Sequence, residues 1–125
     1  MIAPAIGYTK ILVCDNQLET RTHLGQVLMD AGYQPLIAKN MDEVVPLIES
    51  ENPKLLLLEV TESNENVFQV ASYLRQSGME IPMFFMTSNH DTLSCVYSMV
   101  VGAAGYFRKP IDTEELLCRI EDVIA

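Results

Sequence analysis

Short runs of apolar residues alternate along the chain with longer segments in which apolar residues recur every three or four positions. A run that is apolar at nearly every position is typical of a strand covered on both faces, because both rows of its side chains are buried. The most apolar run, LLLLEV, therefore predicts a central strand. The expected strands are residues 10–14, 35–38, 55–60, 81–86 and 105–108.

The segments between these runs have the period of amphipathic helices. Gly32 follows the first of them, and helices commonly end on a glycine. Asn40 with Glu43, and Asp112 with Glu115, have the spacing of capping boxes, which satisfy free N–H groups at the start of a helix. The expected helices are residues 18–31, 40–48, 66–76, 91–101 and 112–124.

Strand–helix pairs repeated five times predict an α/β fold, namely a five-stranded, doubly wound parallel sheet with helices on both faces. A length of 125 residues suits one domain, with residues 1–8 as an N-terminal extension. In such sheets the ligand site lies at the carboxyl ends of the strands. The residues that follow each strand are therefore candidate site residues.

Charge and composition exclude several classes of partner. The chain has 8 basic and 17 acidic residues, and its net charge of −9 argues against binding to nucleic acid. No apolar run approaches the roughly 20 residues that span a bilayer, and residues 1–8 lack the charged region of a signal peptide. Cys14, Cys95 and Cys118 have no paired spacing, which predicts three reduced, buried thiols. We therefore expect a cytoplasmic protein without membrane or nucleic-acid partners.

Polar side chains follow four of the predicted strands. Asp15 and Asn16 follow the first strand, Glu59 ends the third, Thr87 follows the fourth and Lys109 follows the fifth. A buried carboxylate is unfavourable unless it is paired, so Lys109 is the expected partner of Glu59. Acids, a hydroxyl and an amine are therefore predicted to converge at one edge of the sheet.

The segments ILVCDN, LLLLEV, FFMTS and GYFRKP occur in the order and at the spacings of receiver domains of two-component response regulators. The chain resembles this family over residues 10–125. The resemblance implies a flavodoxin-like fold with strand order 2-1-3-4-5. It also implies a signalling role, in which an aspartate at the end of the third strand accepts a phosphoryl group from a kinase.

The resemblance assigns roles to further residues. Thr87 and Lys109 match the positions that bond the phosphoryl oxygens, and Tyr106 matches an aromatic residue that changes rotamer. The positions that it implies for Mg²⁺ are Asp15, Asn16, Glu59 and the carbonyl of Thr61.

The chain departs from the family pattern within this site. Glu59 replaces the acceptor aspartate, and its additional methylene extends the carboxyl group by about 1.5 Å, which impairs in-line transfer. Asn16 replaces an acid and removes a negative charge that Mg²⁺ prefers. Ser63 and Val67 stand where receivers usually carry proline and glycine, so the carbonyl of Thr61 is in doubt as a ligand. Two carboxylates remain for a weak Mg²⁺ site, and no other cofactor is expected.

These residues leave several interpretations open. In the first, Glu59 stands in for a charged acceptor and holds Thr87 and Tyr106 in an active-like arrangement. In the second, the site is structural: Glu59 and Lys109 satisfy each other, and Tyr106 is a surface aromatic. In the third, Glu59 still accepts a phosphoryl group.

The leading hypothesis is a non-catalytic, receiver-like interaction module, which is not an enzyme. The alternative is a phosphorelay receiver that uses Glu59 with Mg²⁺. A small-ligand sensor is a weaker idea, and no glycine-rich phosphate loop follows the first strand to support nucleotide binding.

The predicted fourth helix is unusually apolar, since residues 92–106 contain no Lys, Arg or Glu. Its apolar residues cover more of the circumference than one buried stripe needs, which predicts an exposed apolar surface for a protein partner. In receivers the fourth helix, fifth strand and fifth helix form the usual output and dimer face. The implied partners are a histidine kinase, a fused output domain or a second copy; the alternative is that an appended segment covers this surface. The predicted partner-surface residues are Val96, Tyr97, Val100, Val101 and Tyr106.

Overall fold

The fold is taken from a computed structural model, which describes residues 9–60, 65–88 and 102–124. Its strands are β1 (Lys10–Cys14), β2 (Gln34–Ala38), β3 (Leu55–Glu59), β4 (Met83–Thr87) and β5 (Gly105–Arg108). Its α-helices are α1 (Leu18–Asp30), α2 (Val44–Glu51), α3 (Glu65–Ser77) and α5 (Thr113–Ile124), and a short 3₁₀ helix, η1 (Met41–Glu43), precedes α2.

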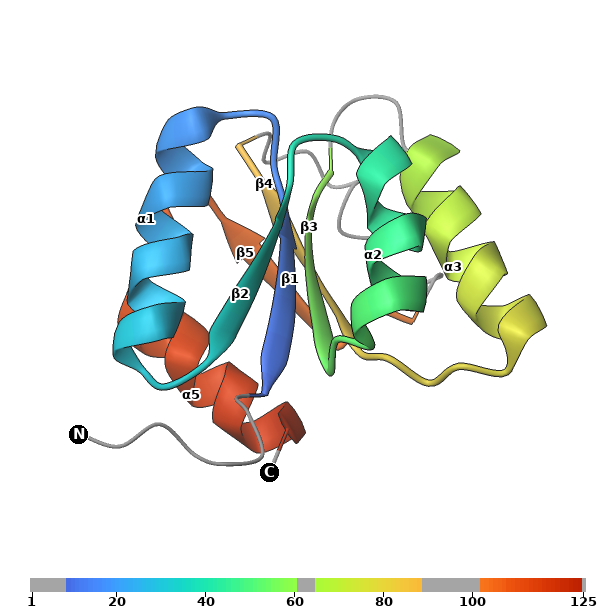
Figure 1. The fold of residues 1–125 in the computed structure, drawn as a ribbon. Coiled ribbons are helices and arrows are strands. Elements are labelled where there is room, and N and C mark those ends of the chain that lie inside the picture. Colours follow the sequence, from blue (N-terminus) through green and yellow to red (C-terminus); the bar gives the residue numbers. More distant parts are fainter. Residues whose placement is uncertain (1–8, 61–64, 89–101, 125) are drawn as a thin grey trace.

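All five strands belong to one parallel sheet with the order β2-β1-β3-β4-β5. Helices α1 and α5 cover one face of this sheet, and α2 and α3 cover the other (Figure 1). The predicted flavodoxin-like fold is therefore confirmed. Strand β3 is central as expected, and its four leucines are fully buried.

Alternate residues of β1, β3 and β4 enter two separate apolar clusters, because successive side chains of a strand point to opposite faces. Leu12 and Leu58 pack in the α2/α3 cluster, on the face covered by those helices. Val13 and Leu57 pack in the α1/α5 cluster on the other face. Strands β1, β3 and β4 are thus buried on both faces, which is why their sequences are apolar nearly throughout, whereas Ile37 of β2 is 43% exposed.

Several element boundaries differ from the sequence-based expectation. The predicted helix at residues 40–48 begins as the 3₁₀ turn η1, and its α-helical part begins at Val44. The side chain of Asn40 makes no capping bond; instead Glu43 Oε1 accepts the backbone N–H of Lys39 at 2.7 Å. Strand β4 begins at Met83, directly after Pro82, because proline has no N–H for the ladder.

Other boundaries agree with the expectation. Tyr33 donates its N–H to the carbonyl of Leu28, and Gly32 has a φ of 93°, so α1 ends in the left-handed turn that glycine permits. At the start of α5, Asp112 Oδ1 accepts the N–H groups of Glu114 and Glu115 at 3.1 and 3.2 Å. The predicted cap of α5 is therefore confirmed.

The prediction of three buried thiols is wrong for Cys118, which lies on the exposed side of α5, and correct for Cys14. Cys95, residues 1–8 and the predicted helix at residues 91–101 lie outside the described residues. The same holds for four of the predicted partner-surface residues: Val96, Tyr97, Val100 and Val101. Among the helices that the structure describes, none has the length and apolar character needed to cross a membrane.

Candidate functional site

The period-two alternation of the strands brings three charged residues to one side of one sheet edge. Asp15 lies two positions after Val13, and Glu59 two positions after Leu57, so each continues a row that packs against α1 and α5. Lys109 follows the same rule on β5, two positions after Phe107. Strands β1, β3 and β5 are thereby linked at their carboxyl ends by side chains rather than by the backbone ladder.

Asp15 is almost completely buried, with 1% of its surface exposed. Its Oδ1 accepts the N–H of Gln17 at 2.9 Å, and its Oδ2 forms an ion pair with Lys109 Nζ at 2.5 Å. Arg21 Nη1 donates to the carbonyl of Asp15 at 2.9 Å and holds the loop after β1 against α1. Both carboxylate oxygens of Asp15 are therefore used within the protein.

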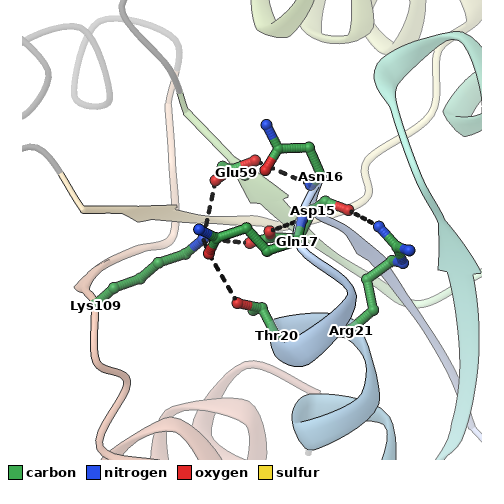
Figure 2. A network of polar contacts seen from close by, with 7 residues as sticks. All are labelled: Asp15, Asn16, Gln17, Thr20, Arg21, Glu59 and Lys109. Carbon is green, nitrogen blue, oxygen red and sulfur yellow. Dashed lines mark hydrogen bonds and ion pairs between the residues drawn. The ribbon is translucent and has the colours of Figure 1, made fainter.

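Glu59 makes a matching pair of bonds from the end of β3. Its Oε2 lies 2.9 Å from Lys109 Nζ, and its Oε1 accepts the backbone N–H of Asn16 at 3.1 Å (Figure 2). The predicted pairing of Glu59 with Lys109 is thus found. The length of the glutamate side chain lets one carboxylate reach both the segment after β5 and the loop after β1.

Lys109 is the shared partner of both carboxylates, and only 11% of its side chain is exposed. Burial lowers the pKa of Lys109, but the hydrogen bonds and charges of Asp15 and Glu59 more than offset this, so its pKa is raised. The ammonium therefore stays charged at physiological pH. Removing one partner of a buried ion pair typically destabilises a fold by about 3–5 kcal/mol, because the other charge remains without its partner.

Sequence reasoning missed the contribution of Gln17. Its Oε1 accepts from Lys109 Nζ and from Thr20 Oγ1, each at 3.3 Å (Figure 2). The sequence feature that could have indicated this role is a polar residue two positions after Asp15, directly before the predicted helix. Because Gln17 and Lys109 are 92 positions apart in the chain, their contact needs the tertiary structure.

The remaining predicted residues lie around this cluster in different ways. Thr87 is buried at the end of β4, and its carbonyl accepts the backbone N–H of Lys109 at 2.8 Å. Tyr106 is half-buried, with its ring packed against the α2/α3 cluster and its hydroxyl oxygen buried, so its interpretation as a surface aromatic is wrong. The exposed residue Asn16 contributes its backbone N–H, and Thr61 lies outside the described residues.

The described residues do not fit a magnesium ion as they stand. Each of the four carboxylate oxygens of Asp15 and Glu59 already contacts an N–H or ammonium group of the protein. Mg²⁺ prefers anionic oxygens, and the Lys109 ammonium neutralises one of the two charges while repelling a second cation. Within the described part of the chain, no group of three or more acidic, histidine or cysteine residues is arranged to hold a metal.

A groove of about 500 Å³ adjoins this cluster between the start of α1 and the segment that follows β5. Gln17, Thr20, Lys109 and Ile111 are among the residues that line it. The solvent therefore approaches the Lys109 ammonium from the side on which Gln17 lies.

Comparison with known proteins gives a consistent family. The family model of the response regulator receiver domain matches residues 11–121. Transcriptional regulatory protein PcoR of Escherichia coli is 29% identical over 115 residues, which are 92% of this chain and 51% of PcoR. Response regulator MprA of Mycolicibacterium vanbaalenii is 30% identical over 115 residues, covering 92% of this chain and 50% of MprA. The chain spans about half the length of the curated relatives it matches.

Solved structures agree on the fold. A response regulator from Thermotoga maritima has a TM-score of 0.83 with this chain at 22% identity, and the match covers 94% of this chain and 98% of that one. The chemotaxis protein CheY4 of Vibrio cholerae has a TM-score of 0.82 at 23% identity, and the match covers 94% and 99% of the two chains.

Proposed function

Because the chain belongs to the response regulator receiver domain family, we propose that it is a cytoplasmic pseudo-receiver of a two-component system. It acts by contact with protein partners, transfers no phosphoryl group and catalyses no reaction. One observation carries this proposal: both carboxylates of the site are joined to the ammonium of Lys109, at 2.5 Å from Asp15 and 2.9 Å from Glu59.

Phosphoryl transfer to Glu59 needs a free carboxylate oxygen and a cation to neutralise the incoming group. Glu59 Oε2 is paired with Lys109, and Glu59 Oε1 accepts the N–H of Asn16. A phosphoryl donor must therefore displace the ion pair at Oε2 or the hydrogen bond at Oε1 before that oxygen is free to attack. The alternative function, a phosphorelay receiver at Glu59, requires that rearrangement.

The same contacts favour a module with one fixed conformation. Glu59 joins the end of β3 to Lys109 after β5 and to the loop after β1, so the three segments are held together without a phosphoryl group. A receiver that switches needs a difference in contacts between its two states. Here the contact to Lys109 that a phosphoryl group would supply is made by the glutamate itself.

Mass spectrometry of the intact protein tests the proposal after incubation with acetyl phosphate and Mg²⁺. We expect no gain of a phosphoryl group by the unaltered chain. Glu59→Asp is the matched variant, because it shortens the acid by one methylene and releases the ion pair at the same position. A stable phosphoryl group on the unaltered chain that disappears in Glu59→Gln would refute the proposal and establish the alternative.

The proposed partner surface rests on the sequence alone, because Tyr97 and Val100 lie outside the described residues. Exposed apolar patches mark protein contacts, and a kinase, an output domain or a second copy are the proposed occupants. Replacing Tyr97 and Val100 by glutamate is expected to weaken self-association or partner binding. Unchanged sedimentation and unchanged pull-down of partners would contradict this part of the proposal.

A further inference from the structure

Three side-chain oxygens surround the ammonium of Lys109: two come from the loop between β1 and α1, and one comes from the end of β3. Asp15 Oδ2, just after β1, lies 2.5 Å from Lys109 Nζ, and Glu59 Oε2, at the end of β3, lies 2.9 Å from it. Gln17 Oε1, just before α1, lies 3.3 Å from the same nitrogen (Figure 2). A lysine ammonium has three N–H donors and no acceptor. The number of oxygens around the ammonium thus equals its number of donors: two accept hydrogen bonds, and Asp15 Oδ2 adds an ion pair.

We propose that the Lys109 ammonium is the resident cation of this site and that Gln17 is the positioning residue that closes it toward the solvent. This inference rests on the proposed function and deepens it, because it names what keeps the site closed. Asp15 and Glu59 then need no metal ion, since an internal cation balances one of their charges and occupies the space between them.

The conformation of Gln17 supports its positioning role. Gln17 is the residue that precedes the first turn of α1, where a side chain usually bonds the free N–H groups of the helix. Its side chain makes no such bond. Its backbone N–H donates to Asp15 Oδ1 at 2.9 Å. Its side-chain oxygen accepts hydrogen bonds from the hydroxyl of Thr20 and from the ammonium of Lys109.

Burial separates the roles of the three acceptors. The side chain of Asp15 is fully buried, whereas that of Glu59 is 13% exposed, about as much as the 11% of Lys109 itself. Gln17 is exposed and also lines the groove beside Lys109. A reagent or cation that enters from the groove therefore meets Gln17 before it reaches the amine.

Amine labelling of the full chain, read residue by residue by mass spectrometry, tests the role of Gln17. Lys39 and Lys54 are exposed and serve as internal references. We expect Lys109 to react about tenfold more slowly than either, as hydrogen bonds to a charged group imply. Gln17→Ala is expected to raise the rate at Lys109 by about threefold without changing the rates at Lys39 and Lys54.

Two further variants make the labelling specific. Gln26→Ala removes the same type of side chain from the exposed surface of α1, where Gln26 bonds Asp30 at 2.8 Å, and it should leave Lys109 as slow as before. Gln17→Glu keeps an acceptor oxygen, so the labelling of Lys109 should remain slow in this variant. Labelling of Lys109 as fast as Lys39, or equal effects of Gln17→Ala and Gln26→Ala, would overturn the proposal.

Titration with magnesium chloride in a calorimeter tests the resident cation. The unaltered chain should give no binding heat, whereas Lys109→Met leaves two carboxylates facing each other and should gain a binding site. The double variant Lys109→Met with Glu59→Gln should lose that gain. Magnesium binding by the unaltered chain as tight as that of Lys109→Met, or no gain in a folded Lys109→Met variant, would refute the inference.

The outcomes separate this inference from the proposed function. If Lys109→Met fails to fold by circular dichroism, the labelling of the Gln17 variants decides, because that side chain is exposed. A chain that takes up no phosphoryl group but labels freely at Lys109 refutes the resident cation alone. A chain that is phosphorylated at Glu59 refutes the proposed function, whatever the labelling rate.

Discussion

At the scale of single residues, the length of Glu59 decides how the site is connected. One carboxylate reaches Lys109 Nζ at 2.9 Å and the N–H of Asn16 at 3.1 Å. An aspartate at this position would end about 1.5 Å earlier, too short to hold both partners in the same backbone geometry. The substitution that impairs phosphoryl transfer is therefore also the one that supplies the internal contacts.

Cys14 lies next to the carboxylates, in the last position of β1, and only 3% of its surface is exposed. Burial, followed by the negative charges of Asp15, Glu59 and Glu43, raises the pKa of its thiol to about 12 from an ordinary value of 9.0. The folded protein thus keeps the thiol protonated at a pH at which the unfolded chain ionises it.

We predict that this difference makes the fold less stable in alkali. Because the folded pKa is the higher one, the contribution of Cys14 is complete below pH 9.0 and is lost as the pH rises toward about 12. Its full size is roughly 4 kcal/mol. Urea unfolding of Cys14→Ala should show a smaller loss of stability above pH 9 than the unaltered chain.

Cys118→Ala is the control for this prediction, since Cys118 is exposed and should leave the pH dependence unchanged. Parallel stability curves for Cys14→Ala and the unaltered chain would contradict it. Tyr33 and Lys109 also have raised pKa values, but they are present in both chains and cancel in the comparison.

At the scale of elements, the outer edge of β2 is protected against pairing with another strand. Gln34 donates to Thr9 and Ala38 accepts from Asp15, so these residues of β2 face β1. The alternate positions point outward. There Pro35 has no N–H, and the N–H of Lys39 is bonded to Glu43. Two of the outward positions therefore offer no donor to an added strand, which limits edge-to-edge association.

The start of α5 permits a direct test of a cap read from the sequence. Asp112→Ala removes the acceptor for the N–H groups of Glu114 and Glu115 and is expected to lower the free energy of unfolding by about 1 kcal/mol. Asp122→Ala removes the same type of side chain from an exposed position in the last turn of α5 and should not destabilise the fold. Equal effects of the two variants in urea unfolding would mean that the cap does not stabilise α5.

For the molecule as a whole, the two apolar clusters share strands β1, β3 and β4 of one sheet. Leu12 belongs to the α2/α3 cluster, while its neighbours Ile11 and Val13 belong to the α1/α5 cluster. Loss of one cluster would expose one face of β1 and β3 to water. The clusters are therefore expected to unfold together, as one domain.

We predict a single cooperative unfolding transition for the isolated chain. Far-UV circular dichroism follows the helices, and tyrosine fluorescence follows the packing, because the chain has 5 Tyr and no Trp. The two probes should give the same urea midpoint. Separate midpoints would contradict a single domain and would indicate that one helical layer detaches first.

The hydrophobic pattern predicted a parallel sheet with helices on both faces, because the central strands are apolar throughout, whereas the order of the strands was predicted from the family resemblance. The pattern also predicted that Glu59 needs a partner and that Lys109 supplies it. Cys118 could have been placed correctly as well, since it lies two positions from both Leu116 and Ile120, on the opposite side of the helix. The helical period would have predicted that Cys118 is exposed, whereas the apolar composition around it predicted burial.

The parallel sheet and the gathering of charges at its carboxyl edge could be predicted from the order of residues, because both follow from periodicity and from the direction of the strands. The folded arrangement was needed to show that Asp15, Glu59 and Gln17 share one ammonium, and that Tyr106 packs inward. Lys109 lies 50 positions from Glu59 and 92 from Gln17. The partners of such long side chains depend on the distances between elements, and these distances cannot be read from the order of residues in the chain.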